Sequence, residues 1–453
     1  MQKPWHSNRS AEEPPVLTTA TKKLEPLLVD ETTGLPQSPK DTRNYVYLMF
    51  MVFGFGALLP WNMFINISHD YYTNFKLQYN GTKTWESDNF QFLMPIASQL
   101  PNLIFSIANI FLAVKGDLTR RMRHCLAVVQ IMILITIICI YVDTESWTTL
   151  FFTMTILSII LLNAANGLYQ NSLFGLASSF PFKYTNAIII GQNFCGIIVA
   201  LIATSTKAIA DEVQLRAFLY FGIAAVIVLI CLILLNIIKK FTFFKVYDVT
   251  EANAYDDDDD IKKEITTWED VRIAFGGSTP QFVNIFLLFF VTLSLFPNIV
   301  MYVKDNAPGK PHNFIVSEYY FMDIGIFLNF NTFAFLGSLL ANYVRKPSPN
   351  KIWIAVVARF WFLFYFPNAN YYPEFARGYA PIFTSTWIFM INLAIMAFTS
   401  GYFSSLIMMY APRYHEEPRI QRMAGMIAAF FLIAGVFTGL CFSGIIKFFI
   451  LNI

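Results

Sequence analysis

Apolar runs of bilayer length are the feature that most limits how this chain can fold. Eleven stretches are apolar and nearly free of charge, and about 20 such residues suffice for a helix that crosses a bilayer. Only 14% of the 453 residues are charged, whereas soluble proteins carry about 25%. We therefore expect an all-α integral membrane protein. The expected spans cover residues 44–65, 91–115, 123–142, 148–178, 185–206, 215–238, 281–303, 318–344, 352–367, 383–410 and 424–450.

Two polar segments divide the chain. Residues 1–43 are polar and proline-rich, which is typical of a disordered cytosolic tail. Residues 239–280 contain the acidic run Asp256–Asp260, and we interpret this segment as a solvated cytosolic loop. The expected domains are an N-terminal bundle of six helices (44–238) and a C-terminal bundle of five (281–453). Transporters built on such a plan hold their substrate between the two bundles.

The distribution of lysine and arginine predicts the orientation in the membrane. These residues gather in the N-terminal tail and in the loops on the same side, and positive charge marks the cytosolic side. We therefore expect a cytosolic N-terminus and, with an odd number of spans, an extracellular or lumenal C-terminus. Asn80-Gly81-Thr82 is a glycosylation sequon in the first outer loop, in agreement with this orientation. The plasma membrane and an endosomal or lysosomal membrane are both open, and we favour the plasma membrane.

The far end of the first span contains residues that a simple membrane anchor would not need. Gly54 and Gly56 permit the close approach of another helix, and Pro60 removes one backbone hydrogen bond. Trp61 offers a flat aromatic face and an N–H donor, and Asn62 offers a donor and an acceptor. Trp61 fits either the aromatic belt of a membrane interface or a stacking surface for a flat solute.

The fourth span carries amide side chains inside the membrane. Asn163 and Gln170 are seven residues apart and share one helix face, with Asn166 close to it. Such amides can join helices through hydrogen bonds worth roughly 0.6–2 kcal/mol each. They can equally form a hydrogen-bonding wall for a polar solute, because polar groups in a membrane span are costly unless they are used.

Two segments resemble the equilibrative nucleoside transporter family. The string Gly54–Phe64 (GFGALLPWNMF) resembles the signature of its first helix, and Gln170–Ala177 (QNSLFGLA) resembles a segment of its fourth. The resemblance implies a major-facilitator-like fold with eleven transmembrane helices in a 6+5 arrangement. It also implies that Leu58 and Trp61 line the substrate site and that Gln170 contacts the substrate.

The eighth span departs from the family pattern Asn-x-x-Asp-x-x-x-Arg. The aligned residues are Asn331, Ala334 and Ser338, so the asparagine is present and both charged residues are absent. We expect Asn331 to bind substrate. Losing only one of the charges would leave an unpaired buried ion at a cost of several kcal/mol, so their joint loss is compatible with a folded protein. It predicts weaker ribose recognition and a preference for nucleobases or other flat neutral solutes.

Three further polar residues are candidates for substrate contact or gating. They are Asn62, Gln99 in the second span and Arg359 in the ninth. Arg359 could pair with a helix carbonyl, with Asp323 or with the substrate, because a charge inside a membrane is a functional candidate. The pair Gly191-Gln192 in the fifth span matches a pair found in the family, and we interpret Gly191 as a packing residue.

These observations predict facilitative (equilibrative) transport of nucleosides or nucleobases by alternating access. We expect no ion coupling, because no Asp, Glu or His falls near the middle of a span. A non-transporting receptor or scaffold on a transporter body, and a transporter of other flat neutral solutes, are the alternatives. The spans hold no nucleophile beside a base, so we expect no enzyme and no catalytic residue. We also expect no cofactor, no metal and no nucleic acid; the partners are the substrate and the lipid bilayer, and the oligomeric state is open.

Overall fold

The structure is a computed structural model that describes residues 40–112, 117–209, 212–248, 268–307, 310–372 and 379–452. These residues form helices almost throughout, and the β-structure among them is one short hairpin and isolated bridges. Most of the expected tail (1–43) and the acidic run Asp256–Asp260 lie outside the described residues.

Ten helices in the described part of the chain are long and apolar enough to cross a membrane. Six of them precede residue 241 and lie at the first six expected spans. They are α2 (Tyr45–Ile67), α3 (Trp85–Leu112), α4 (Leu118–Ile140), α5 (Thr148–Ser178), α6 (Phe182–Ile209) and α7 (Val213–Ile237).

Four long helices follow, together with a shorter apolar helix, Ile352–Asn368, at the expected ninth span. The sequence predicts eleven spans, of which the ninth is short, and the described residues hold ten long helices and one short one. The elements are α10 (Trp268–Leu295), α11 (Glu318–Tyr320) continued by η7 (Phe321–Leu328) and α12 (Asn329–Leu340), α13 (Ile352–Ala358), α14 (Trp361–Tyr365), α15 (Thr386–Tyr410) and α16 (Pro418–Asn452).

Helix α10 begins at Trp268, inside the segment 239–280 that was expected to be a loop. That expectation is wrong for the described part of the segment, because the short helix α8 (Thr242–Tyr247) also lies there. Acidic side chains are favourable in the first turn of a helix. Asp270, in the first turn of α10, pairs with Arg419 of α16 at 2.9 Å. Acidic residues in this segment therefore begin the helix ahead of its apolar run.

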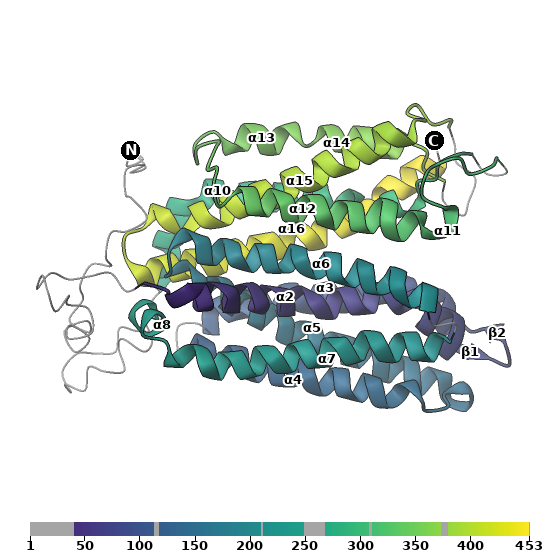
Figure 1. Ribbon diagram of the computed structural model, residues 1–453, viewed down its shortest axis with the longest axis horizontal. Coiled ribbons are helices and arrows are strands. Elements are labelled where there is room, and N and C mark those ends of the chain that lie inside the picture. The colour runs from purple at the N-terminus through teal and green to yellow at the C-terminus, as the bar shows by residue number, and fades with distance from the viewer. Residues whose placement is uncertain are drawn as a thin grey trace, which may run out of the picture.

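The helices run side by side in two groups (Figure 1). Helices α2 to α7 form the first group and α10 to α16 the second, and α6 packs against α12 where the groups meet. The hairpin of β1 (Gln78–Tyr79) and β2 (Thr82–Lys83) lies at one end of the helices, and α8 lies at the other. We call the hairpin end the outer end and the α8 end the inner end.

Apolar packing between the two groups is concentrated towards the inner end. One continuous core includes Phe50 of α2 together with Phe282 of α10 and Met426 of α16. A separate cluster, with Phe321 of η7 and Phe389 of α15 among its members, fills the outer part of the second group alone. Because buried apolar area is the main source of cohesion, the two groups are held together most firmly near the inner end.

Helices α2 and α6 approach each other through two glycines. A Cβ on Gly54 would lie 2.1 Å from the carbonyl oxygen of Ile188, and a Cβ on Gly191 would lie 1.9 Å from that of Met51. These separations are far below a van der Waals contact, so only glycine permits the two backbones to touch. The expected packing role of Gly54 and Gly191 agrees with this geometry.

We expect Gly191→Ala to destabilise the protein by about 1–3 kcal/mol, the usual cost of overpacking, and to lower its melting temperature in detergent. Gly222→Ala in α7 is the matched control, because a Cβ there has no other atom within 4 Å. Alanine is also about 1 kcal/mol better than glycine inside a helix, so the control should be neutral or stabilising. Equal melting temperatures for the two variants would mean that the contact between α2 and α6 widens at little cost.

Candidate functional site

The contact between α6 and α12 forms a polar seam between the two groups of helices. The Asn193 side chain donates to the backbone carbonyl oxygen of Ala334 at 3.3 Å. Two turns towards the inner end, Asn186 donates to the carbonyl oxygen of Ser338 at 2.9 Å. The two helices are antiparallel, so rising residue numbers on α6 meet falling numbers on α12. The seam therefore runs through both positions where the family pattern would place a charge.

Ala334 and Ser338 are buried, at 2% and 0% exposure. The hydroxyl of Ser338 donates to the carbonyl oxygen of Phe335 in its own helix at 2.8 Å. Asn186 and Asn193 use only the backbone oxygens of the two positions. The absent aspartate and arginine are thus replaced by neutral contacts that leave no charge to be compensated.

Asn331 lies on the same seam, against the smallest possible neighbour. A Cβ on Gly196 of α6 would lie 1.9 Å from the side-chain oxygen of Asn331. The amide nitrogen of Asn331 donates to the carbonyl oxygen of Phe327 at 2.8 Å, so its oxygen is the atom turned towards α6. Gly196 therefore lets an amide of α12 reach the backbone of α6 directly.

Asn62 of α2 meets α6 at the residue next to Gly196. Its amide nitrogen lies 3.3 Å from the carbonyl oxygen of Leu58 and 3.8 Å from the sulfur of Cys195. Leu58 and Trp61 are half-buried and pack against the main core. The structure thus brings Asn62 and Asn331 to adjacent residues of α6, Cys195 and Gly196. Leu58 and Trp61 lie beside Asn62 on α2.

Gln170 of α5 is buried at 6% exposure. Its neighbours fix the direction in which it points: the Tyr169 hydroxyl donates to Phe53 of α2 at 2.9 Å, and Asn171 donates to Met426 of α16 at 2.7 Å. Gln170 lies between these two directions, facing from the first group towards the second. Its side chain makes none of the hydrogen bonds by which Tyr169 and Asn171 join α5 to α2 and α16.

Gln99 is buried in α3 at 4% exposure. It lies one turn from Asn102, whose backbone oxygen would be 2.4 Å from a Cβ on Gly167 of α5. One turn further along, Ser106 accepts a hydrogen bond from Asn171 at 3.2 Å. Gln99 therefore lies on the side of α3 that packs against α5, away from the seam between α6 and α12.

Arg359 is held within the second group. Its guanidinium donates to the carbonyl oxygen of Met396 at 2.9 Å and to the hydroxyl of Thr292 at 2.7 Å, and it also contacts the Thr399 hydroxyl. Of the two protein partners expected for Arg359, the structure shows the helix carbonyl. Asp323 pairs with a different residue, Lys207.

The pair between Lys207 of α6 and Asp323 of η7 joins the two groups at their outer end. Its N–O distance is 2.6 Å, and the two side chains are 21% and 5% exposed. The Lys207 ammonium also lies 5.8 Å from the ring centroid of Tyr319. We call Lys207 and Asp323 the outer clasp. Sequence reasoning missed it because the partners are 116 residues apart and each charge lies near the end of its helix.

Direct contacts also close the inner end. Arg413, which follows α15, donates to the carbonyl oxygen of Phe180, which follows α5. A Cβ on Gly425 of α16 would lie 1.8 Å from the hydroxyl oxygen of Ser178. The loops and helix ends of the two groups are therefore in contact there, in line with the shared core.

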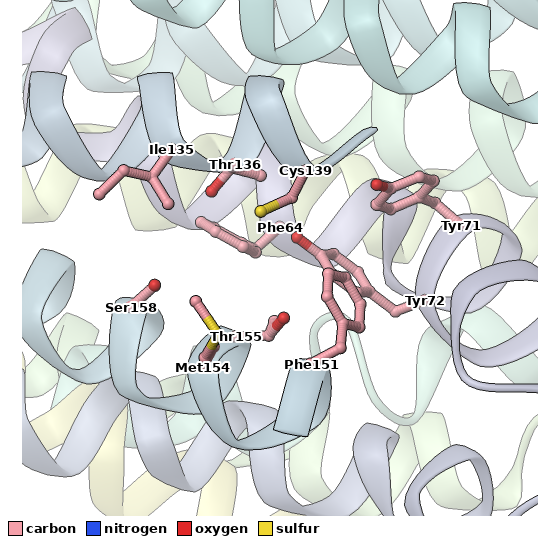
Figure 2. A pocket seen from close by; sticks show the side chains of 10 residues that line it. All are labelled: Phe64, Tyr71, Tyr72, Ile135, Thr136, Cys139, Phe151, Met154, Thr155 and Ser158. Atoms are coloured by element: carbon pink, nitrogen blue, oxygen red, sulfur yellow. The ribbon is translucent and has the colours of Figure 1, made fainter. Parts of the chain in front are cut away.

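Figure 2 shows a pocket in the outer part of the first group, lined by α2, α4, α5 and the π-helical segment η3 (Ser68–Lys76). Tyr72 and Cys139 form part of its wall, and the exposed side chains of Ile135 and Met154 lie at its edge. Because exposed apolar residues on a membrane helix face lipid, this pocket lies on the lipid-facing side of the first group. None of the expected substrate residues lines it.

Asn80 lies at the tip of the β1–β2 hairpin. Asn80 and Gly81 have φ values of 47° and 70°, the combination that a tight Asn-Gly hairpin turn requires. The side chain is exposed, so the sequon is sterically accessible to a glycosylating enzyme. Among the described residues, no group of three or more His, Cys, Asp or Glu side chains could hold a metal ion.

Two groups of membrane-length helices that meet along a polar seam define a two-bundle integral membrane fold. Solved structures support this fold. A variant of the E. coli fucose:proton symporter FucP aligns with a TM-score of 0.55 at 10% identity, over 89% of this chain and 96% of that chain. FucP in the outward conformation aligns with a TM-score of 0.56 at 12% identity, over 89% and 97%. The expected all-α, major-facilitator-like fold is confirmed.

The family follows from the sequence itself. A family model described as nucleoside transporter matches residues 156–448, and the chain belongs to this family. Human "Equilibrative nucleoside transporter 1" is 26% identical over 452 residues, covering 89% of this chain and 97% of that protein. Rat "Equilibrative nucleoside transporter 2" is 28% identical over 459 residues, covering 90% and 98%. The chain is therefore a multi-pass membrane carrier and not an enzyme.

Proposed function

We propose that this protein carries nucleosides or nucleobases across its membrane by facilitative transport, through alternating access and without ion coupling. The observation that carries the proposal is the position of Gln170, which is buried and lies on α5 between a residue that contacts α2 and one that contacts α16. Trp61 supplies an aromatic face suited to a stacked base. The relatives described above are named as transporters of nucleosides.

Alternating access is supported by the way the two groups touch. The inner end is joined by a shared apolar core, whereas a charged pair, the outer clasp, joins the outer end at the seam. An ion pair separates more readily into water than an apolar core does, because water solvates both charges. We infer that the outer end is the one poised to open and that the opposite state requires the inner core to part.

Ion coupling is disfavoured because the charges of the spans are already engaged. Asp323 is committed to Lys207, and Arg359 is committed to α10 and α15. Proton or sodium coupling usually uses an acidic group inside the membrane that can change its partner. Transport driven by the solute gradient alone is therefore the simplest mechanism that these residues support.

Uptake into sealed vesicles that contain the purified protein tests the proposal. Labelled adenosine and adenine are offered without ion gradients, and then with an imposed proton or sodium gradient. We expect flux that follows the solute gradient and does not respond to the ion gradients. A strong dependence on either ion gradient would contradict the uncoupled mechanism. Saturable binding without flux would instead favour a receptor built on a transporter body.

The two solutes also separate nucleosides from nucleobases. Because Ala334 and Ser338 replace the charged pair of the family pattern, we propose that contacts to the ribose hydroxyls are weaker here. Adenine flux that exceeds adenosine flux would agree with this. Equal affinity for the two would mean that Trp61, Gln170 and Asn331 suffice to hold a ribose-bearing solute.

Trp61→Ala is expected to raise the KM for adenosine or adenine about tenfold or more, because base–aromatic stacking is worth about 1–3 kcal/mol. Trp85→Ala is the matched control, since Trp85 is 65% exposed at the beginning of α3. Both variants lose an indole, so a fall in expression caused by this loss alone would appear in both. An unchanged KM for Trp61→Ala would assign this residue to the membrane interface.

We further propose that the protein lies in the plasma membrane with its N-terminus in the cytosol and its C-terminus outside. The outer end of the helices would then face the extracellular side, and the exposed Asn80 would carry a glycan. Asn80→Gln should remove the mass that a glycosidase removes from the wild-type protein expressed in cells. A wild-type protein that the glycosidase leaves unchanged would contradict both the glycan and its use as an orientation marker.

A further inference from the structure

Gln192 of α6 is a buried amide with no established use. The residue is 8% exposed, and its side-chain nitrogen has no hydrogen-bond partner among the described residues. An unpaired buried donor destabilises a protein, and lipid offers no compensating partner. A group of this kind is retained where something outside the chain supplies the missing hydrogen bond.

The neighbours of Gln192 show where its side chain points. Cys195 faces α2, where it lies 3.8 Å from the amide nitrogen of Asn62. Gly196 faces α12, where it meets Asn331. Successive residues of a helix are about 100° apart, so Gln192 points between the direction of Cys195 and that of Gly196. Its amide is thus directed between α2 and α12, the helices that carry the expected substrate residues Leu58, Trp61 and Asn331.

Helix α5 carries a second amide, Gln170, at a similar distance from the inner end of the bundle. The hydroxyl of Thr185 donates to the carbonyl oxygen of Ala177 at 3.2 Å, which sets the register of the antiparallel helices α5 and α6 at their inner ends. Seven residues, or about two turns, towards the outer end lead to Gln192 on α6 and to Gln170 on α5. The two glutamines therefore lie at about the same height along the bundle, and no hydrogen bond joins them in the described residues, where α6 packs chiefly against α2 and α12.

We propose that Gln192 and Gln170 form a pair of amides that reads the edge of the substrate base. A glutamine amide presents a donor beside an acceptor, the arrangement that matches N6 and N7 of adenine. The polar contacts to the substrate would then come from α5 and α6. Helix α12, across the seam, would contribute no charged contact, because Ala334 and Ser338 are neutral. The inference rests on the proposed function and extends it to a specific contact, the 6-amino group of a purine.

Comparison of adenosine with purine riboside, which lacks only the 6-amino group, tests the contact. The measurement is the KM of each compound for uptake into vesicles, together with the same comparison for adenine and purine. We expect the wild-type protein to prefer the amino compound about tenfold, the usual worth of one hydrogen bond in a buried site. Gln192→Met, which preserves length and removes the amide, should abolish the preference by raising the KM of the amino compound alone. Gln192→Asn, which keeps an amide, should retain part of it.

Gln130→Met in α4 is the matched control. Gln130 also has a buried amide atom without a partner among the described residues, but α4 packs chiefly against α5 and α7 within the first group. We expect this variant to keep the wild-type preference.

Full preference for the amino compound in Gln192→Met would overturn the inference, while wild-type flux would still uphold the proposed function. An equal rise in KM for both compounds would also overturn it, because Gln192 would then act on the fold or on the ribose. No wild-type flux of any of the four compounds would contradict the proposed function and the inference with it.

Discussion

Ser338→Arg alone is expected to be among the most damaging single substitutions in this protein. Ser338 is completely buried, and Ala334, one turn away, supplies no carboxylate to pair with an arginine. A buried charge without a partner destabilises a protein by about 3–5 kcal/mol. We expect a large fall in the yield of folded protein and in its melting temperature in detergent. Ser338→Ala, which loses only a hydrogen bond to Phe335, should be nearly neutral.

The double variant Ala334→Asp with Ser338→Arg separates charge from size. Residues four apart on a helix lie side by side, so the introduced aspartate can reach the introduced arginine. We expect the double variant to recover a large part of the stability lost in Ser338→Arg. Ser338→Met, which is long and uncharged, reports the steric part of the loss. A double variant no more stable than Ser338→Arg, or a methionine variant as damaged as the arginine variant, would mean that space and not charge decides which residues the seam accepts.

The stable double variant would also test what the pair does for substrate selection. A carboxylate and a guanidinium one turn apart can bind hydroxyl groups. Adenosine uptake should then rise relative to adenine uptake in the double variant, if the seam borders the substrate path. Unchanged relative uptake would place Ala334 and Ser338 away from the path.

The fold was largely predictable because apolar length is a strong local signal. Every expected span coincides with a helix, and the family strings agree with the observed class. The errors arose where charge and apolar length disagree. Helix α10 begins at Trp268 because its acidic first turn is stabilised by the helix N-terminus and by Arg419. The apolar stretch Ile352–Asn368 is a series of short helical pieces, which its hydropathy alone did not reveal.

The site was less predictable because its contacts join distant helices. Gly196 carries no functional signal in the sequence, and its role becomes clear when Asn331 is found against it. The orphaned amide of Gln192 cannot be recognised from sequence, because spacing along a helix does not say which polar atoms find partners. Arg359 illustrates the converse, since only the positions of α10 and α15 show that its protein partners are a helix carbonyl and a hydroxyl rather than Asp323.

Reversal of the charge at Asp323 is expected to open the outer end. Asp323→Lys would place two ammonium groups at a contact now 2.6 Å long, and like charges repel across such an interface at a cost of several kcal/mol. A reporter thiol at Ala203, which is buried on α6 one turn inward of Lys207, measures the opening. We expect a water-soluble maleimide to label Ala203→Cys at least about tenfold faster in the Asp323→Lys background, because close charge pairs contribute about 1.5 kcal/mol or more.

The exchanged pair Lys207→Asp with Asp323→Lys is the decisive companion to this variant. It restores attraction between the groups with the polarity reversed, so labelling at position 203 should return towards the wild-type rate. A rate that stays high would mean that Asp323 acts through its surroundings in η7, and the outer clasp would then be a feature of the second group alone. Recovery would establish that a charged pair, and not apolar packing, holds the outer end closed. The inner end, which is joined by a shared apolar core, should be insensitive to the same exchange.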